Sequence, residues 1–173
     1  ASKGEGLGNQ FLTNIRNTAA ICQVVRCFDD PNIVHVEGSV DPIRDIETIN
    51  TELIFADLDT VDRALQKSVK VARGGNAEEK DLVAALEKCK AELEEFRLLK
   101  NLSFDDKEED LLKTYQLLTK KPMMFAVNVS EEDLAVGTNE YVEKVREYAK
   151  QHDSEVVVFS AKVESELTEI EDD

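Results

Sequence analysis

The chain of 173 residues is long enough for one ordinary hydrophobic core, or for a core with an extended appendage. Its apolar content of 42% fits a soluble globular protein, and its net charge of −16 argues against broad, charge-driven binding to nucleic acid. No apolar run approaches the roughly 20 residues that span a bilayer, so the sequence predicts no transmembrane helix.

The cysteines and histidines show no pattern of a disulfide framework or a metal site. Cys22, Cys27 and Cys89 are odd in number and have neither CxxC nor Cys/His spacing, and His35 and His152 stand alone. This usage favours a reduced, cytoplasmic setting.

The first predicted elements are a helix over 10–18 and a strand over 21–28. The strand segment, ICQVVRCF, is apolar almost throughout and partly β-branched. Such near-continuous apolar runs favour a strand in a parallel sheet that is covered on both faces.

A long amphipathic helix is predicted to begin at Asp41-Pro42, because Asp is a favoured N-cap and Pro has its φ fixed for the first helical position. Arg73-Gly74-Gly75-Asn76 then ends this helix and allows the chain to reverse. The apolar positions of the helix recur at helical spacing: Ile46, Ile49, Leu53, Ala56, Leu58, Val61 and Leu65.

A second helix carries the spacing of a coiled-coil seam, at Leu82, Leu86, Cys89, Leu93 and Phe96. Two such helices joined by a Gly-Gly turn predict an antiparallel helical hairpin. The segment SFDD at 103–106 is typical of a helix cap, here for a third helix over 107–118. The hairpin is either packed along the main domain or a projecting arm that contacts a partner, and the pattern fits both.

Two further strands are predicted over 123–129 and 155–160, with an amphipathic helix over 139–151 between them. Strands that alternate with helices are typical of βαβ units, so the sequence predicts an α/β domain. The helical segment of about 41–117 interrupts this domain as an insertion.

The residues directly after the two later strands are the candidate site, because ligands of doubly wound α/β sheets bind beyond the carboxyl ends of the strands. Asn128-Val129-Ser130-Glu131 follows one strand and Ser160-Ala161-Lys162 follows the other. Taken separately, each of these two segments also fits a purely structural role, since Ser130 is a good N-cap with Asp133 in the first helical turn. Together, Asn-x-x-acid and Ser-Ala-Lys resemble the base-recognition loops of Ras-like P-loop NTPases.

Further motifs narrow this resemblance to one branch of those NTPases. The segment KGEGLGNQFL at 3–12 resembles the glycine-rich second switch of Obg-like proteins. With VVRCF at 24–28, HVEG at 35–38, DIETINTEL at 45–53 and VESEL at 163–167, essentially the whole chain is similar to the YchF family of Obg-like ATPases.

The resemblance implies an α/β fold, a partial Ras-like P-loop NTPase sheet with an inserted antiparallel α-helical hairpin, or coiled-coil, domain. It divides the chain into the second switch with the following strand (1–40), the inserted hairpin (41–117) and the base-recognition half of the NTPase domain (118–173). Because the chain begins with alanine rather than methionine, we expect it to lie within a longer protein, after the Asp-x-x-Gly switch motif and before the TGS domain of that family.

The resemblance also implies the function of the intact protein, a ribosome-associated, cytoplasmic nucleotide switch that binds ATP with Mg²⁺, and GTP less well, and hydrolyses it slowly. The implied partner is the ribosome, through its large subunit, with no membrane and no sequence-specific DNA. The phosphate-binding motif Gly-x-x-x-x-Gly-Lys-Ser/Thr is absent from these 173 residues, so we expect the chain alone to hydrolyse no nucleotide. Two alternatives stay open, a GTPase of the Obg type and a non-catalytic helical module that docks a protein partner.

The resemblance assigns base recognition to both loops, at Asn128, Val129, Glu131, Ser160, Ala161 and Lys162. The Asn amide is a good partner for N6 and N7 of adenine. Glu131 stands where guanine-specific relatives have Asp, and a longer Glu that turns away leaves the guanine N1–H and N2–H₂ donors unmatched. Adenine is therefore expected to be preferred over guanine.

In the second switch, the resemblance implies that Gly6 and Gly8 allow the segment to reorder around a γ-phosphate. The apolar Leu7 and the lack of a water-orienting Gln predict slow hydrolysis without a partner. Lys3 and Glu5 are further candidates for polar contacts in the switch. No residue of this chain is predicted to bind the metal.

Overall fold

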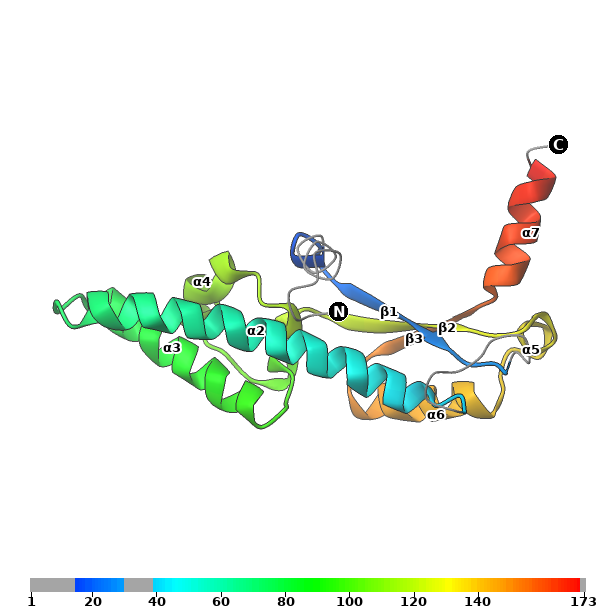
Figure 1. Ribbon diagram of the computed structural model, residues 1–173, viewed down its shortest axis with the longest axis horizontal. Coiled ribbons are helices and arrows are strands. Elements are labelled where there is room, and N and C mark those ends of the chain that lie inside the picture. The colour runs from blue at the N-terminus through cyan, green and yellow to red at the C-terminus, as the bar shows by residue number, and fades with distance from the viewer. Residues whose placement is uncertain (1–14, 30–38, 172–173) are drawn as a thin grey trace. The chain divides into compact units, whose positions relative to one another are not determined.

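The computed structural model describes residues 15–29 and 39–171 of the chain (Figure 1). The strands are β1 (Ile21–Arg26), β2 (Met123–Asn128) and β3 (Glu155–Phe159). The α-helices are α2 (Pro42–Ala72), α3 (Ala77–Glu94), α4 (Asp106–Leu112), α5 (Glu131–Val136), α6 (Glu140–Gln151) and α7 (Ala161–Glu171). Short 3₁₀ helices lie at η1 (Leu99–Asn101), η2 (Lys113–Tyr115) and η3 (Leu118–Lys120).

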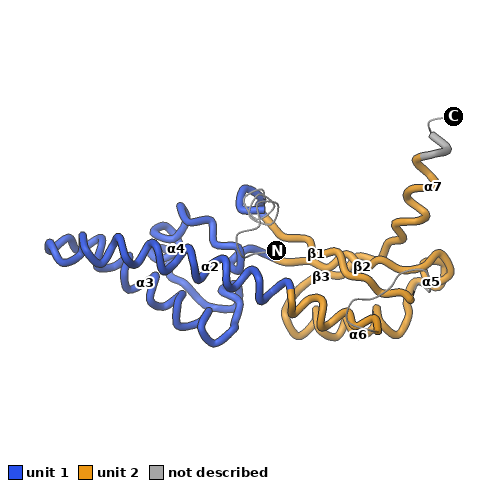
Figure 2. Tube along the Cα trace, viewed as in Figure 1, with its two compact units in different colours: residues 1–19, 49–122 blue, residues 20–48, 123–173 orange. Residues whose placement is uncertain are grey.

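The chain divides into two compact units, which Figure 2 colours separately. The helical unit consists of residues 1–19 and 49–122, and the sheet unit of residues 20–48 and 123–173. The long helix α2 has its first turns in the sheet unit and the rest in the helical unit.

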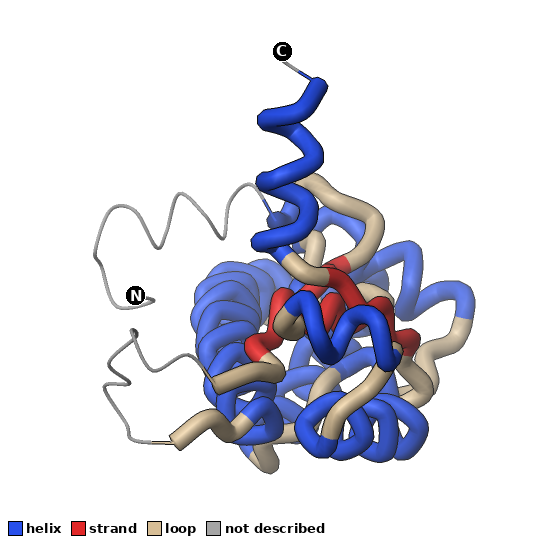
Figure 3. Tube along the Cα trace, turned by 90° about the vertical axis from the view of Figure 1, so that its right-hand side faces the viewer, coloured by secondary structure: helices blue, strands red, loops and turns tan. Residues whose placement is uncertain are grey.

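The sheet is parallel, in the order β1-β2-β3, and its strands lie side by side (red in Figure 3). Ile21 pairs with Met123 at one end of the sheet, and Asn128 pairs with Phe159 at the other. The predicted α/β class is confirmed. β1 ends two residues before its predicted end, and β2 and β3 each end one residue before theirs.

One face of the sheet carries the core of the sheet unit. Side chains at alternate strand positions point to the same face, and Val25, Phe125 and Val127 are buried on this one. They pack with residues of α6 and with Ile46 of α2: Val142, Val145, Ala149 and Ile46. At about 25 cal/mol per Å² of buried apolar surface, such a cluster is the main stabilising contribution to this unit.

The opposite face of the sheet is open among the described residues. Val24 and Val157 lie there in one row across Ala126 and are 69% and 47% exposed. The prediction of a sheet covered on both faces is therefore wrong for the part of the chain that the structure describes. An apolar strand indicates how much surface needs cover, but it does not say which segment provides it.

Helix α2 begins as predicted, with the Asp41 carboxylate accepting a hydrogen bond from the Arg44 N–H at 3.1 Å. Its buried side recurs at steps of three and four residues: Ile46, Asn50, Leu53, Asp57, Val61, Ala64 and Ser68. The prediction that Ile49 belongs to this side is wrong, because Ile49 is 42% exposed. The buried stripe passes through three polar residues that an apolar pattern leaves out: Asn50, Asp57 and Ser68.

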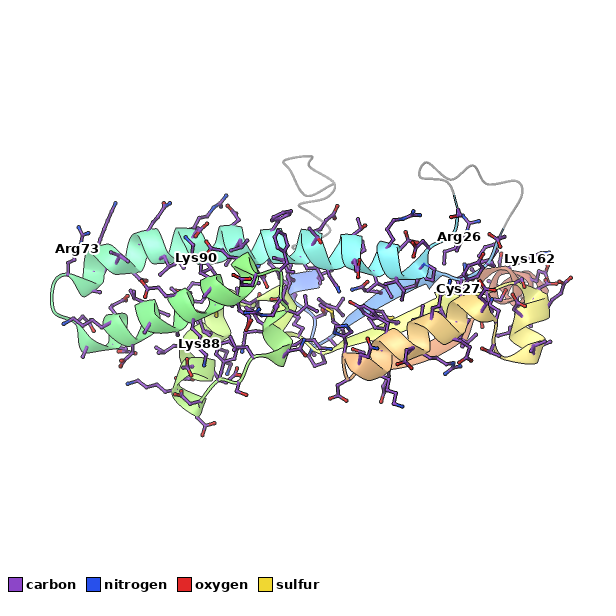
Figure 4. The ribbon with its side chains drawn as sticks, turned by 90° about the horizontal axis from the view of Figure 1, so that it is seen from below. Arg26, Cys27, Arg73, Lys88, Lys90 and Lys162 are labelled. Atoms are coloured by element: carbon purple, nitrogen blue, oxygen red, sulfur yellow. The ribbon has the colours of Figure 1, made fainter. Side chains whose placement is uncertain are left out.

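Helix α3 lies beside α2 (Figures 1 and 4), and the Lys90 ammonium pairs with the Asp62 carboxylate at 2.9 Å. The predicted seam is buried at Leu86, Cys89 and Leu93. Phe96 does not continue it, because α3 ends at Glu94 and Phe96 has a φ of +55°, in the left-handed region that ends helices. Its exposed ring instead contacts Phe55 edge-to-face, with centroids 6.0 Å apart.

The other predicted helices are confirmed at their starts. Asp105 caps α4 with a capping box to Glu108, but the helix ends at Leu112 rather than 118, and Gln116 with a φ of +48° lies beyond it. Asn139 caps α6, and α6 runs to Gln151 as predicted. Most of the helix predicted over 10–18 lies outside the described residues.

The open sheet face and the buried cores predict different reactivities for the three cysteines. Cys22 is exposed on β1, whereas burial raises the pKa of the Cys27 and Cys89 thiols to about 12. Because the thiolate is the nucleophile, iodoacetamide at pH 8 is expected to alkylate Cys22 alone in the folded chain and all three after denaturation. Mass spectrometry counts the adducts, and a Cys22→Ser variant serves as the unreactive control. Equal native alkylation of Cys22 and Cys27 would contradict this packing.

Candidate functional site

The two loops predicted to form the site begin side by side. Asn128, the last residue of β2, is in register with Phe159, the last residue of β3. The Val129 N–H continues the pairing by donating to the Phe159 carbonyl at 2.9 Å. The parallel register therefore brings the β2 loop (128–131) and the β3 loop (160–162) together at one end of the sheet.

Asn128 joins the two loops directly. Its side-chain oxygen Oδ1 accepts a hydrogen bond from the Ala161 N–H at 2.9 Å. The oxygen is thus engaged within the protein, so among the described residues the amide nitrogen Nδ2 is the end of Asn128 that remains for a ligand. Ala161, which the resemblance assigns to base recognition, donates its backbone N–H to Asn128.

Val129 and Ser160 have structural roles in this arrangement. The Val129 side chain belongs to the core of the sheet unit, and its N–H is donated to Phe159, so neither is available to a ligand. Ser160 is 1% exposed, and its hydroxyl oxygen accepts a hydrogen bond from the Val163 N–H in the first turn of α7. Both residues hold the two loops in place.

Glu131 and Lys162 connect the loops at the surface. The Lys162 ammonium lies 3.8 Å from the Glu131 carboxylate, and Lys162 is labelled in Figure 4. Both side chains are exposed, so the pair adds at most about 1 kcal/mol to stability. Its effect is to orient the Glu131 carboxylate toward the β3 loop.

Ser130 is confirmed as the N-cap of α5, since its hydroxyl accepts a hydrogen bond from the Asp133 N–H at 3.2 Å. Asn128 reaches the β3 loop while Ser130 starts the helix. The structural interpretation of this segment and its interpretation as a site are therefore compatible.

A cavity of about 380 Å³ lies where the ends of β1 and β2 meet α6, and sequence reasoning missed it. The Tyr141 hydroxyl donates to the Asp29 carboxylate at 2.7 Å, a bond that raises the pKa of Tyr141. The Asn139 amide donates to the Cys27 carbonyl at 2.7 Å and to the Asp133 carboxylate at 2.9 Å. These residues come from three separate segments, so no local motif predicts that they lie together.

The predicted second-switch residues Gly6, Leu7 and Gly8, with Lys3 and Glu5, lie outside the described residues. Within residues 15–29 and 39–171, no group of His, Cys, Asp and Glu side chains has the arrangement of a metal site. None of the helices in those ranges is both long and apolar enough to cross a membrane.

Known proteins resemble the chain over its whole length. It is 48% identical over 173 residues to the ribosome-binding ATPase YchF of Escherichia coli O157:H7, and 47% identical over 175 residues to that of Bacillus subtilis strain 168. A solved structure of the Schizosaccharomyces pombe YchF GTPase matches 98% of this chain with a TM-score of 0.83 and 36% identity. No family model matches the chain.

These matches extend over only part of each relative. The chain spans 47% of the length of both curated relatives and 47% of the solved chain. All of its own length is nevertheless accounted for, in sequence and in fold. The chain is therefore similar to YchF proteins over its whole length, and the resemblance drawn from its motifs is confirmed.

Proposed function

We propose that this chain is the base-recognising part of a YchF-type nucleotide switch, which in the intact protein binds ATP with Mg²⁺ and hydrolyses it slowly. The observation that carries this proposal is the hydrogen bond from the Ala161 N–H to the Asn128 side chain. It unites the two predicted base-recognition loops at the carboxyl ends of adjacent parallel strands, the place where α/β sheets bind ligands. The relatives named as ATPases support the reaction.

Adenine is the base that this arrangement favours. Both purines present N7 as an acceptor, so the Asn128 Nδ2 donor suits either of them. The Asn128 Oδ1, which was expected to accept from adenine N6, already accepts from the Ala161 N–H, so the N6 contact gives adenine no advantage here. Guanine also needs an acceptor for N1–H and N2–H₂ and a donor for O6. The Glu131 carboxylate is oriented toward Lys162, and the Ala161 N–H is already donated to Asn128, so neither is directed at a guanine. ATP is thus the proposed ligand and GTP the weaker one.

A GTPase is the second candidate, because the solved neighbour is described as a YchF GTPase. It differs from the first only in the base. The choice between them depends on whether Glu131 keeps its contact with Lys162 when a nucleotide is bound.

The helical insertion is the proposed partner-binding part. We assign residues 41–117 to an antiparallel coiled-coil hairpin, between NTPase segments 1–40 and 118–173. The Lys90–Asp62 ion pair and the Phe55–Phe96 contact between the two long helical segments support this assignment. The names of the relatives support a ribosome as the partner. We assign the contact to its large subunit and place the protein in the cytoplasm. The second switch around Gly6, Leu7 and Gly8 would transmit the presence of the γ-phosphate to the helical insertion.

Substitution of Asn128 tests the proposed base site. Asn128→Ala is expected to weaken binding of fluorescent ATP by the full-length protein about tenfold, because one hydrogen bond to the base and the tie between the loops are both lost. Asn101→Ala changes an exposed Asn of the helical unit and is the matched control, expected to leave affinity unchanged. If Asn128→Ala binds ATP as the wild type does, the base site lies elsewhere.

The base preference is tested at Glu131. Glu131→Asp shortens the side chain, moves the carboxylate away from Lys162 and makes it available to guanine. The ratio of GTP to ATP affinity in full-length protein should rise about tenfold. Glu132→Asp, the same change one residue later, should leave the ratio as it is. If the wild-type protein already prefers GTP, the second candidate function, a GTPase, is correct in place of the ATPase.

The chain of 173 residues alone is expected to show no ATP turnover, since it contains no Gly-x-x-x-x-Gly-Lys-Ser/Thr segment to cradle the phosphates. A phosphate-release assay at micromolar protein measures this, with the full-length protein as the positive control. Turnover by the short chain would place catalytic residues within it.

A further inference from the structure

A buried carboxylate ties α2 to the segment before β2. Asp57 of α2 is fully buried, and its two oxygens accept three hydrogen bonds. The donors are the Leu118 N–H at 2.9 Å, the Thr119 N–H at 2.8 Å and the Thr119 hydroxyl at 2.6 Å. Burial raises the pKa of the Asp57 carboxyl, while these donors favour its charged form. The partnered carboxylate therefore fixes the backbone of residues 118 and 119 against α2.

Two residues further on, Lys121 ties the same segment to residues 15–18. Its ammonium donates to the Ile15 carbonyl at 3.0 Å and the Arg16 carbonyl at 2.6 Å, and also to the Thr18 carbonyl. These are three different backbone acceptors, and an ammonium has three donors, so Lys121 is saturated. Burial and the nearby Arg16 lower the pKa of Lys121.

The two anchors lie on one short stretch of chain. The segment 118–121, held by both Asp57 and Lys121, consists of the 3₁₀ helix η3 (Leu118–Lys120) followed by Lys121 in extended backbone. Arg16, whose carbonyl accepts from Lys121, also lies close enough to Asp57 to favour its charged form. Hydrogen bonds of this kind depend on direction. A displacement of one end of segment 118–121 is therefore either passed to its other end or breaks one of these hydrogen bonds.

We propose that residues 118–121 are a mechanical coupler, in which Lys121 and Asp57 transmit the position of residues 15–18 to helix α2. Residues 15–18 directly follow the predicted second switch in the chain, and α2 (Pro42–Ala72) is the first long helix of the proposed partner-binding insertion. That the coupler transmits the nucleotide state rests on the proposed function. The mechanical link between residues 15–18 and helix α2 does not.

Hydrogen exchange of the full-length protein without nucleotide tests the coupler. Lys121→Met removes the three donors and keeps an unbranched side chain of nearly the same length. It should accelerate exchange of the Leu118 and Thr119 amides, and of α2 amides around Asp57, by about fivefold, because a segment released at one end leaves the buried carboxylate more often. Acceleration confined to residues 15–20 would overturn the proposal.

Matched variants separate coupling from general destabilisation. Lys121→Arg keeps a cation with several N–H donors and should restore slow exchange near Asp57. Lys113→Met changes an exposed lysine of the same unit and should have no effect. Exchange of the α6 amides monitors global unfolding, and an equal acceleration there would also overturn the proposal.

Changes at the other anchor make the test reciprocal. Asp57→Asn should accelerate exchange at residues 15–20, and Thr119→Val, which removes one of the three bonds to Asp57, should do so more weakly. Thr119→Val keeps the test decisive if Asp57→Asn does not fold, since unchanged exchange at 15–20 in it would contradict the coupling.

Addition of ATP and Mg²⁺ separates this proposal from the proposed function. If ATP changes α2 exchange in the wild type but not in Lys121→Met, the coupler carries the nucleotide signal. A change that persists in Lys121→Met overturns the coupler alone. If ATP changes no exchange in the wild type, the proposed nucleotide switch is wrong. The nucleotide-free comparison of the wild type with Lys121→Met still tests the coupler.

Discussion

The parallel pairing of β2 with β3 is the constraint on which the candidate site depends. Parallel strands end at the same edge of a sheet, so two loops separated by about 30 residues of chain start from neighbouring positions. Asn128 needs only the reach of its own side chain to bind the Ala161 backbone. Helix α6, which connects the strands, also supplies the buried face that holds them in register.

Features set by local chemistry could be predicted from the sequence. The caps at Asp41, Asp105 and Ser130 lie where the pattern placed them, because a cap needs only its own side chain and the next turn of backbone. The three strands and their parallel order follow from apolar runs separated by helical patterns. The two site loops were found because their residues follow those strands.

Features that depend on distant partners could not be predicted. Asp57 is buried because Leu118 and Thr119, about 60 residues later, supply its donors, and an apolar-periodicity argument discards such a position. The same omission placed Ile49 on the wrong side of α2. Phe96 matched the seam by spacing, yet a left-handed backbone ends the helix before it. The Asn139–Tyr141 cavity needs three separate segments to meet.

The bond between Asn128 and the Ala161 backbone has an energetic consequence for recognition. A side chain that a ligand must immobilise costs about 0.5–1.5 kcal/mol in rotamer freedom, and Asn128 has already lost that freedom in the unliganded fold. In the proposed base site, a nucleotide would therefore meet a donor whose rotamer entropy was already lost during folding. The proposed discrimination between bases would then be a property of the folded sheet edge, present before any nucleotide arrives.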